Sequence, residues 1–305
     1  MEEISINENN NVYKEIESNM DIRGVNVNYV ILNGKLTKKE EANISVFNKA
    51  MFFNFAVYDS MKVVKGESFF PEFHVDRLIE SAKIIKLEHK FTKEEVLQWI
   101  EMLIEKNNLH DAMIRFLLLG AGGPQEEPQL FLFPVGLTFY RSGDYNRGVK
   151  AITFHGERPI PQSKSKDLLI NFMALREAIH QDAKDALLVD SAGCIREGTR
   201  TNFFAVKNGK IYTAPLTEVL EGVTRKIVIK LAKENNIEVI EKKIKVSKLK
   251  EYDEFFFTST SMNVLPIAQI DDYEIPGNVG TTTKKLIKLF KNYYRKEVFQ
   301  DENAE

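Results

Sequence analysis

Short stretches rich in apolar residues recur in the first 140 residues, some separated by turn residues and two of them almost wholly apolar, and they predict β-strands. Asn33-Gly34 and Lys65-Gly66 separate such stretches, so each pair of strands is predicted to form a hairpin. Thr92 and Glu95 form a capping box ahead of an amphipathic helix. The predicted elements of this half are strands within 27–38, 56–70, 112–120 and 130–140, and helices at 73–86 and from 93 onward.

The second half predicts a similar mixture with shorter strands. A strand over 149–155 is followed by a loop that carries two lysines, and apolar spacing predicts a helix over about 168–182. Turn residues at Ser191-Ala192-Gly193 and Asn208-Gly209 divide the next stretch into a β-meander. The remaining predicted elements are helices at 221–236 and 281–298, and strands at 237–244, 254–260 and 263–270.

A polar, glycine-bearing segment at 141–148 separates the two halves, and we place an interdomain linker there. Residues 1–22 are rich in Asn and Glu and predict a flexible lead-in. We therefore expect a small N-terminal domain over 23–140 and a large domain over 149–305. A chain of 305 residues has the length of two ordinary domains.

Composition narrows the class of protein. A formal net charge of -2 argues against a nucleic-acid partner, because phosphate binding requires a basic surplus. Cys194 is the only cysteine, and no apolar run approaches the ~18 residues of a membrane span. We expect a cytoplasmic protein with no nucleic-acid or membrane partner. The histidines form no metal constellation, and we expect His74 at a helix start or at the surface.

Lys164 and Lys166 stand two positions apart just ahead of the helix predicted over 168–182. Surface lysines are common, so exposure to water explains both of them. A lysine amine in a loop can also act as a nucleophile or a base. Other parts of the chain must decide between these interpretations.

Four further features could bind one ligand, three of them through its phosphate and the fourth through a protonated ring nitrogen. Gly222-Val223-Thr224 begins a predicted helix, whose N–H groups attract phosphate, and Thr258-Ser259-Thr260-Ser261 ends an apolar strand. Arg77 carries a guanidinium fork that matches a phosphate dianion, and Glu197 precedes a glycine at a strand end. Caps, turns and solvated charges explain each feature taken alone. Together with a lysine they are the groups that pyridoxal phosphate requires.

The order of these segments resembles that of the fold-type IV pyridoxal-phosphate enzymes. That family includes branched-chain and D-amino-acid aminotransferases and aminodeoxychorismate lyase. The resemblance runs from about residue 28 to residue 295 and implies an α/β (α+β) fold of two domains. The smaller N-terminal domain is α/β, and the larger C-terminal domain has a β-rich, barrel-like core. The matching segments are AVYDSMKV, FHVDRL, KSKDLLINFMALREA, ALLVDSAGCIREGTRTNFFAVKNGKIYTAP, LEGVTRKIV and DEFFFTSTSMNVLPI.

The resemblance also implies roles for individual residues. Lys164, not Lys166, corresponds to the lysine that forms a Schiff base with pyridoxal 5'-phosphate and then serves as the catalytic base. Glu197 corresponds to the residue at the pyridine nitrogen. The implied phosphate-binding residues are Arg77, Val223, Thr224, Thr260 and Ser261. The residues expected at the substrate pocket are Tyr58, Phe55, Arg115 and Met262.

Some positions depart from the family pattern. The family usually carries Asp-Arg-Gly and then Gly-Asp-Gly ahead of the tyrosine strand, where this chain has Asn48-Lys49-Ala50 and Asn54-Phe55-Ala56. A bulky Phe55 changes the wall of the site. The D-amino-acid enzymes place a carboxylate-binding arginine where this chain has Leu119-Gly120-Ala121. Arg115 lies earlier in that strand, and strand alternation leaves its direction open.

The resemblance implies an aminotransferase that moves the amino group of a branched-chain or other apolar L-amino acid to a 2-oxo acid. It also implies a homodimer. Three alternatives remain open: a lyase of the aminodeoxychorismate type that releases pyruvate, a D-amino-acid aminotransferase, and a non-catalytic member that has lost activity.

Overall fold

A computed structural model describes residues 25, 27–123, 126–138, 140–277 and 279–301. They divide into two compact units. Unit 1 contains 138–158 and 169–291, and unit 2 contains 25–137, 159–168 and 292–301. The domains expected over 23–140 and 149–305, and the linker between them, stay a prediction. The lead-in expected over 1–22 lies outside the described residues.

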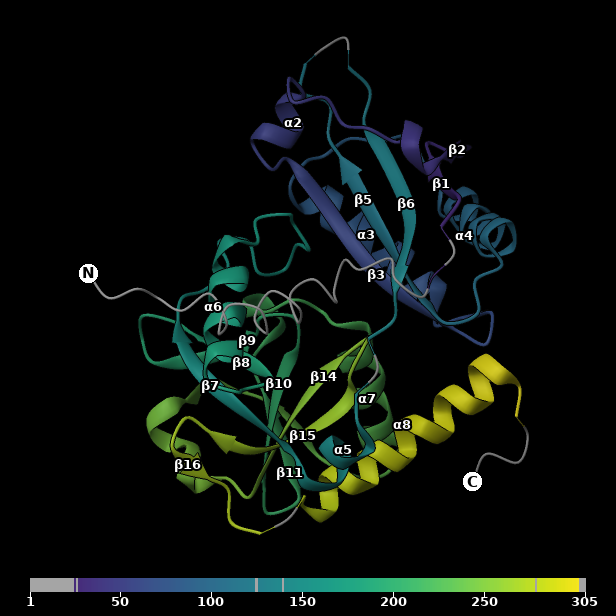
Figure 1. Ribbon diagram of the computed structural model, residues 1–305. Coiled ribbons are helices and arrows are strands. Elements are labelled where there is room, and N and C mark those ends of the chain that lie inside the picture. The colour runs from purple at the N-terminus through teal and green to yellow at the C-terminus, as the bar shows by residue number, and fades with distance from the viewer. Residues whose placement is uncertain (1–24, 26, 124–125, 139, 278, 302–305) are drawn as a thin grey trace, which may run out of the picture. The chain divides into compact units, whose positions relative to one another are not determined.

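Unit 2 is built on an antiparallel sheet of six strands in the order β2-β1-β6-β5-β3-β4 (Figure 1). The predicted hairpin turns are confirmed, since Asn33 and Gly34 have φ values of 48° and 79°. The strands are β1 (Tyr29–Leu32), β2 (Lys35–Lys38), β3 (Ala56–Val64), β4 (Glu67–Ser68), β5 (Ala112–Leu119) and β6 (Gln129–Gly136). The helices are η1 (Lys39–Glu41), α2 (Lys49–Phe52), α3 (Pro71–Ile84) and α4 (Lys93–Asn107).

Helices α3 and α4 cover one face of this sheet (Figure 1). Alternate residues of β3, among them Val57 and Met61, pack against the apolar side of α3 at Val75 and Leu78. The capping box at α4 is confirmed, because the Glu95 amide donates to Thr92 and the Thr92 amide donates to Glu95. Burial of this face fixes the register of β3, since a shift by one residue would expose every core side chain.

Unit 1 is built on a mixed, curled sheet of ten strands in the order β12-β11-β10-β14-β15-β7-β8-β9-β13, with β16 paired to β15. Phe204 and Phe256 stack between β10 and β14 at 4.8 Å between ring centroids. The strands are β7 (Val149–His155), β8 (Asp185–Val189), β9 (Cys194–Gly198), β10 (Asn202–Lys207), β11 (Lys210–Thr213), β12 (Val239–Glu241), β13 (Ile244–Lys245), β14 (Glu254–Ser259), β15 (Asn263–Ile270) and β16 (Tyr273–Glu274). The helices are α5 (Ser142–Arg147), α6 (Leu169–His180), η2 (Leu216–Glu218), α7 (Val223–Glu234), η3 (Val246–Glu251) and α8 (Thr281–Phe299), the last of which ends in unit 2. The expected α/β fold with a β-rich larger part is confirmed.

Two short helices were not expected from the sequence. Helix α2 begins after Asn48, whose side chain accepts a hydrogen bond from the Met51 amide at 2.8 Å. Helix α5 occupies the segment expected as a linker and ends at Gly148, where φ is 79°. Helices of four and six residues are too short to show an apolar period, so pattern reasoning could not find them.

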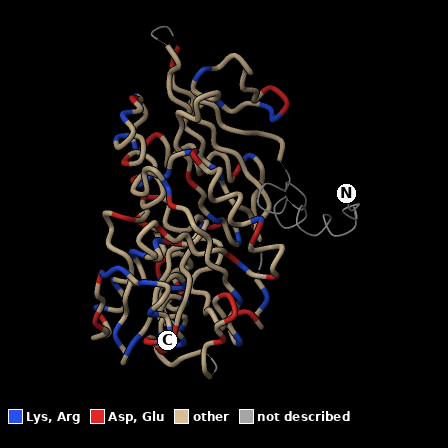
Figure 2. Tube along the Cα trace, turned by 90° about the vertical axis from the view of Figure 1, so that its left-hand side faces the viewer, with Lys and Arg blue, Asp and Glu red and all other residues tan. Residues whose placement is uncertain are grey.

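Basic and acidic residues are interspersed along the chain trace (Figure 2). Among the described residues, none of the helices combines the length and the apolar character needed to cross a membrane.

Candidate active site

The Lys164 segment pairs with the edge of β3 in unit 2. The Tyr58 amide donates to the Lys164 carbonyl at 3.0 Å, and the Lys166 amide donates to the Ala56 carbonyl at 2.9 Å. The Lys164 amide also donates to Ser81 Oγ on α3 at 3.0 Å. The backbone of Lys164 is therefore held by both a strand and a helix.

The two lysines of the segment have different surroundings. The Lys164 amine lies 4.5 Å from the centroid of the Tyr58 ring. The Lys166 amine donates to Asn54 Oδ1 at 3.3 Å in an exposed contact. Of the two candidates, Lys164 is the one beside a second residue expected at the site.

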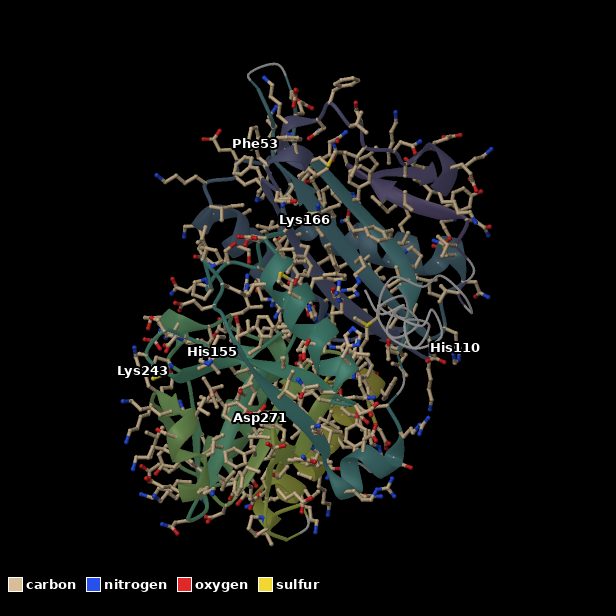
Figure 3. The ribbon with its side chains drawn as sticks, turned by 60° about the vertical axis from the view of Figure 1, so that its left-hand side comes forward. Phe53, His110, His155, Lys166, Lys243 and Asp271 are labelled. Atoms are coloured by element: carbon tan, nitrogen blue, oxygen red, sulfur yellow. The ribbon has the colours of Figure 1, made fainter. Side chains whose placement is uncertain are left out.

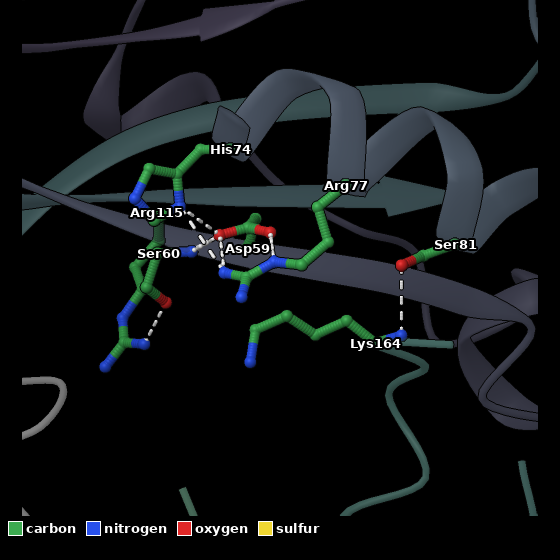
Figure 4. A network of polar contacts seen from close by, with 7 residues as sticks. All are labelled: Asp59, Ser60, His74, Arg77, Ser81, Arg115 and Lys164. Carbon is green, nitrogen blue, oxygen red and sulfur yellow. Dashed lines mark hydrogen bonds and ion pairs between the residues drawn. The ribbon is translucent and has the colours of Figure 1, made fainter. Parts of the chain in front are cut away.

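Arg77 is held by a buried carboxylate (Figure 4). Its Nε and Nη2 atoms donate to the two oxygens of Asp59 at 2.8 and 2.7 Å. His74 Nδ1 lies 2.8 Å from Asp59 Oδ1. Burial acts to raise the pKa of Asp59, but Arg77 and His74 hold that pKa well below its ordinary value. In Figure 4 the Lys164 side chain lies beside the Arg77 guanidinium, on the side away from Asp59.

Asp59 and His74 were missed as site residues. His74 lies in the first turn of α3, as expected, but it is buried, and burial lowers its pKa although Asp59 opposes the change. A signal for Asp59 was present in the sequence. Asp59 shares the core face of β3 with Val57 and Met61, and a carboxylate on a core face must be paired.

The direction of Arg115 is settled by strand pairing. Arg115 on β5 lies opposite Ser60 on β3 and donates to its hydroxyl. Ser60 and Tyr58 alternate with the core residues of β3. Arg115 therefore lies on the same face of the sheet as Tyr58, away from α3.

A cavity of about 750 Å³ is lined by residues of unit 2. Phe53, Phe55 and Ile160 form part of its apolar wall, and the lysine segment contributes Ser165. The Phe53 side chain lies at the surface (Figure 3) and is 74% exposed. The Phe55 ring packs over Gly120 so closely that a Cβ at that position would overlap the ring. Phe55 thus lies at a cavity wall, and its role in a substrate pocket stays a prediction.

In unit 1, Glu197 is the residue before the last of β9, and both of its carboxylate oxygens are engaged. Oε2 accepts from the Leu220 amide at 3.2 Å, and Oε1 lies 3.4 Å from Arg158 Nη1. The Glu197 and Arg158 side chains are 7% and 6% exposed. Arg158 was missed from the sequence, where nothing distinguishes it from a surface arginine.

The start of α7 lies beside this carboxylate. Asn202 Nδ2 donates to the Leu220 carbonyl at 2.9 Å, so Glu197 and Asn202 hold opposite ends of that residue. Gly222 caps the helix, and a Cβ there would overlap Asn202 Oδ1. Val223 and Thr224 form the first turn, whose amides point out of the helix end. The structure thus brings Glu197 and the predicted phosphate-binding turn together.

The hydroxyl-rich segment 258–261 begins in the last two residues of β14, the strand that pairs with β10. Thr258 lies opposite Asn202 in the sheet, and its buried hydroxyl has no hydrogen-bond partner in the described part of the chain. Thr260 and Ser261 are half-buried. Met262 is fully buried in the core of unit 1, so the structure places it in the core and not at a pocket wall.

The residues expected at the site fall into two groups, and each group is defined within its own unit. Unit 1 combines a carboxylate with the amide end of a helix of twelve residues and a buried hydroxyl beside it. This is the chemistry of a site for a phosphate group and a ring cation. Unit 2 combines an anchored lysine with an aromatic ring and an oriented arginine. The first group is Glu197, Val223, Thr224, Thr260 and Ser261, and the second is Tyr58, Phe55, Arg77, Arg115 and Lys164.

Comparison with known proteins places this chemistry in a family. A family model described as Amino-transferase class IV matches residues 56–270. The chain is 34% identical over 277 residues to a putative branched-chain-amino-acid aminotransferase of Methanocaldococcus jannaschii, which covers 86% of this chain and 95% of that protein. It is 31% identical over 274 residues to a D-alanine aminotransferase of Staphylococcus epidermidis, with 87% and 97% covered. The crystal structure of a T.th. branched-chain amino acid aminotransferase with pyridoxamine 5'-phosphate matches with a TM-score of 0.81 at 25% identity, over 90% of this chain and 98% of that one.

Proposed function

The chain belongs to the amino-transferase class IV family, and from this premise we propose that it moves the amino group of a branched-chain or other apolar L-amino acid to a 2-oxo acid. Its cofactor is pyridoxal 5'-phosphate, as in other class IV aminotransferases. The observation that carries the residue assignment is the Lys164 segment. Its backbone is bonded to β3 and α3, and its amine lies over the Tyr58 ring.

The bound cofactor supplies an aldehyde that joins covalently to amines and a ring that accepts the electron pair left when the substrate Cα–H bond breaks. We propose that the Lys164 amine holds the cofactor at this aldehyde. The free amine of Lys164 would then serve as the base that takes up the proton from the substrate Cα and gives it back during amino transfer. Tyr58, under the amine, would orient it.

The residues of unit 1 fit the rest of the cofactor. Glu197 is proposed to accept the hydrogen bond of the protonated ring nitrogen, and the first turn of α7 to bind the phosphate. The Thr258 hydroxyl supports this fit, because it is buried, has no hydrogen-bond partner among the described residues and could be satisfied by a ligand atom. The full proposed phosphate set is Arg77, Val223, Thr224, Thr260 and Ser261.

The substrate side chain is proposed to be apolar. Phe55 at the cavity wall supports an apolar substrate, and so does the name of the M. jannaschii relative. The S. epidermidis relative, named for D-alanine, supports a D-amino acid as the second candidate. Arg115, on the Tyr58 face of the sheet, is proposed as a polar residue of the pocket.

The test is the visible absorption spectrum of the purified protein, recorded before and after L-leucine or D-alanine is added. If the proposal is right, L-leucine converts the yellow form of the cofactor to the pyridoxamine form. Conversion by D-alanine alone would move the assignment to the second candidate. Stoichiometric pyruvate from aminodeoxychorismate, without an amino acceptor, would identify a lyase.

The lysine assignment has a matched control two residues away. Lys164→Ala is expected to abolish amino transfer while the protein stays folded and still binds some cofactor. Lys166→Ala removes the same charge from the same segment and is expected to keep nearly full turnover. Near-normal activity in Lys164→Ala would rule out this lysine as the catalytic amine.

We also propose that the protein is a homodimer in the cytoplasm. Exposed aromatic residues around α2 support a second copy, because Phe47 and Phe52 are 90% and 74% exposed and adjoin Phe53. Sedimentation equilibrium of the parent and of Phe52→Glu tests this. A monomeric parent would contradict the homodimer.

A further inference from the structure

Glu197 shares its buried position with a second charged side chain, that of Arg158. Arg158 lies three residues beyond the end of β7, and its Nη1 atom is 3.4 Å from Glu197 Oε1. Both side chains are more than nine-tenths buried. The other carboxylate oxygen accepts from the Leu220 amide. The position of the carboxylate is therefore fixed from two directions.

The protonation state of Glu197 decides whether it donates a hydrogen bond to a ring nitrogen or accepts one from it. A buried carboxylate without a cation nearby takes up a proton, because burial penalises the charged form. A carboxylic acid donates to an unprotonated pyridine, whereas a carboxylate accepts from a protonated one. An arginine stays charged at any ordinary pH, so it can hold the carboxylate in its ionised state.

We infer that Arg158 is a positioning residue that keeps Glu197 ionised and aimed, so that the cofactor's ring nitrogen remains protonated. This inference rests on the proposed function, since it takes Glu197 as the partner of that nitrogen. Arg158 itself acts through Glu197 and needs no contact with substrate or cofactor.

Two other arginines lie near Glu197, one next to it in the sequence and one within reach of its charge. Neither of them replaces Arg158. The field of Glu197 reaches Arg225, but the described hydrogen bonds of Arg225 go to the Ala214 carbonyl at 3.2 Å and to Glu241 at 3.3 Å. Arg196 is the chain neighbour of Glu197, yet it pairs with Asp190 at 2.7 Å and with Glu218. Arg196 is thus a largely buried arginine on the same strand with different partners, and it serves as the control.

The experiment follows the ring nitrogen directly. The apoprotein of each variant is loaded with pyridoxal 5'-phosphate labelled with ¹⁵N at the ring, and the ¹⁵N chemical shift reports whether that nitrogen is protonated. Affinity is measured in parallel for pyridoxal 5'-phosphate and for its 1-deaza analogue, which lacks the nitrogen. The variants are Arg158→Gln, which keeps a donor without charge, Arg158→Lys, which keeps the charge, and Arg196→Met.

The parent, Arg158→Lys and Arg196→Met are expected to show a protonated nitrogen and the same preference over the 1-deaza analogue. Arg158→Gln is expected to show an unprotonated nitrogen. Its preference should fall by about 10-fold, because charge-assisted hydrogen bonds are markedly stronger than neutral ones. Arg158→Met, which fills the same space with an apolar chain, serves the same test if the glutamine variant does not fold.

A protonated nitrogen and an unchanged preference in Arg158→Gln or Arg158→Met would overturn the inference and leave the proposed function intact. Loss of the protonated signal in Arg196→Met as well would also overturn it, because any buried arginine would then suffice. A parent that fails to bind the cofactor, or that does not distinguish the analogue, would instead count against the proposed role of Glu197.

Discussion

Replacing Lys62 by methionine is expected to stabilise unit 2 at neutral pH. Lys62 lies on β3 and is only 8% exposed, with its amine 4.2 Å from the centroid of Phe69 and 5.5 Å from that of Tyr294. Burial lowers the pKa of Lys62 from 10.5 to about 7. At neutral pH, folding therefore costs free energy at this amine, which must either keep its charge away from water or release its proton, and methionine would remove that cost.

The size and the pH dependence of the effect follow from this pKa. The difference between 10.5 and about 7 corresponds to about 5 kcal/mol, at roughly 1.4 kcal/mol per pH unit. The attraction of the ammonium to the two rings offsets about 2 kcal/mol. We expect Lys62→Met to gain about 3 kcal/mol at pH 7.

The sign of the slope can be stated in advance. Between the folded and unfolded pKa values of Lys62 the unfolded chain binds more protons, so the parent becomes more stable as the pH rises from about 7 toward 10.5. Lys62→Met lacks this group. Its advantage should shrink steadily with rising pH and be nearly gone by about pH 10.

The assay is urea unfolding at pH 7, 8.5 and 10, followed by tryptophan fluorescence. Trp99 is the only tryptophan of the chain and packs against the core of unit 2, so its signal reports that unit. Lys65→Met, at an exposed position of the same hairpin, is the control and should change stability by less than about 0.5 kcal/mol. A less stable Lys62→Met at pH 7, or an advantage that does not change with pH, would refute the reasoning.

Three other changes test the site. Asp59→Asn should cost about 3–5 kcal/mol of unfolding free energy at pH 7, because it leaves the charge of Arg77 poorly compensated. The depressed pKa of Asp59 makes its full contribution present above the unfolded value of ~3.9 and lost as the pH falls through the folded value. In urea unfolding the difference between variant and parent should therefore begin to narrow below about pH 4 and still remain at pH 3. Gly222→Ala should weaken cofactor binding by roughly 10-fold or more, about 1.4 kcal/mol, in a fluorescence titration, since its Cβ would overlap Asn202; unchanged affinity would mean that the first turn of α7 does not bind the phosphate. Thr258→Val should leave stability within about 0.5 kcal/mol of the parent and still weaken cofactor binding, because the hydroxyl has no hydrogen-bond partner to lose in the described part of the chain; equal affinity would show that this hydroxyl faces no ligand.

Local sequence signals were enough to predict most elements. The capping box at Thr92 and the turn at Asn33-Gly34 depend on residues a few positions apart, and the structure confirms both. The order of the motifs was enough to predict the family, which the match over residues 56–270 confirms. The assignment of Lys164 over Lys166 rested on that order and stays a prediction.

Pairings between distant residues were not predicted. Asp59 meets Arg77 across 18 positions, and Arg158 meets Glu197 across 39. Arg158 alone has the ordinary appearance of a surface charge, and the position of Asp59 on a core face indicates burial but does not identify its partner. Only packing that excludes water from both members makes the pair necessary, and packing is a property of the whole fold.

The sequence by itself determined the strands, the long helices, the family and the residue types that suit the cofactor, because these depend on local periodicity and on the order of motifs. The tertiary structure alone decided which charges are buried, which carboxylate orients which arginine, and which face of β5 presents Arg115. The reason is physical. The state and direction of an ionisable side chain depend on the solvent and the partners around it, and residues far apart in the chain provide both.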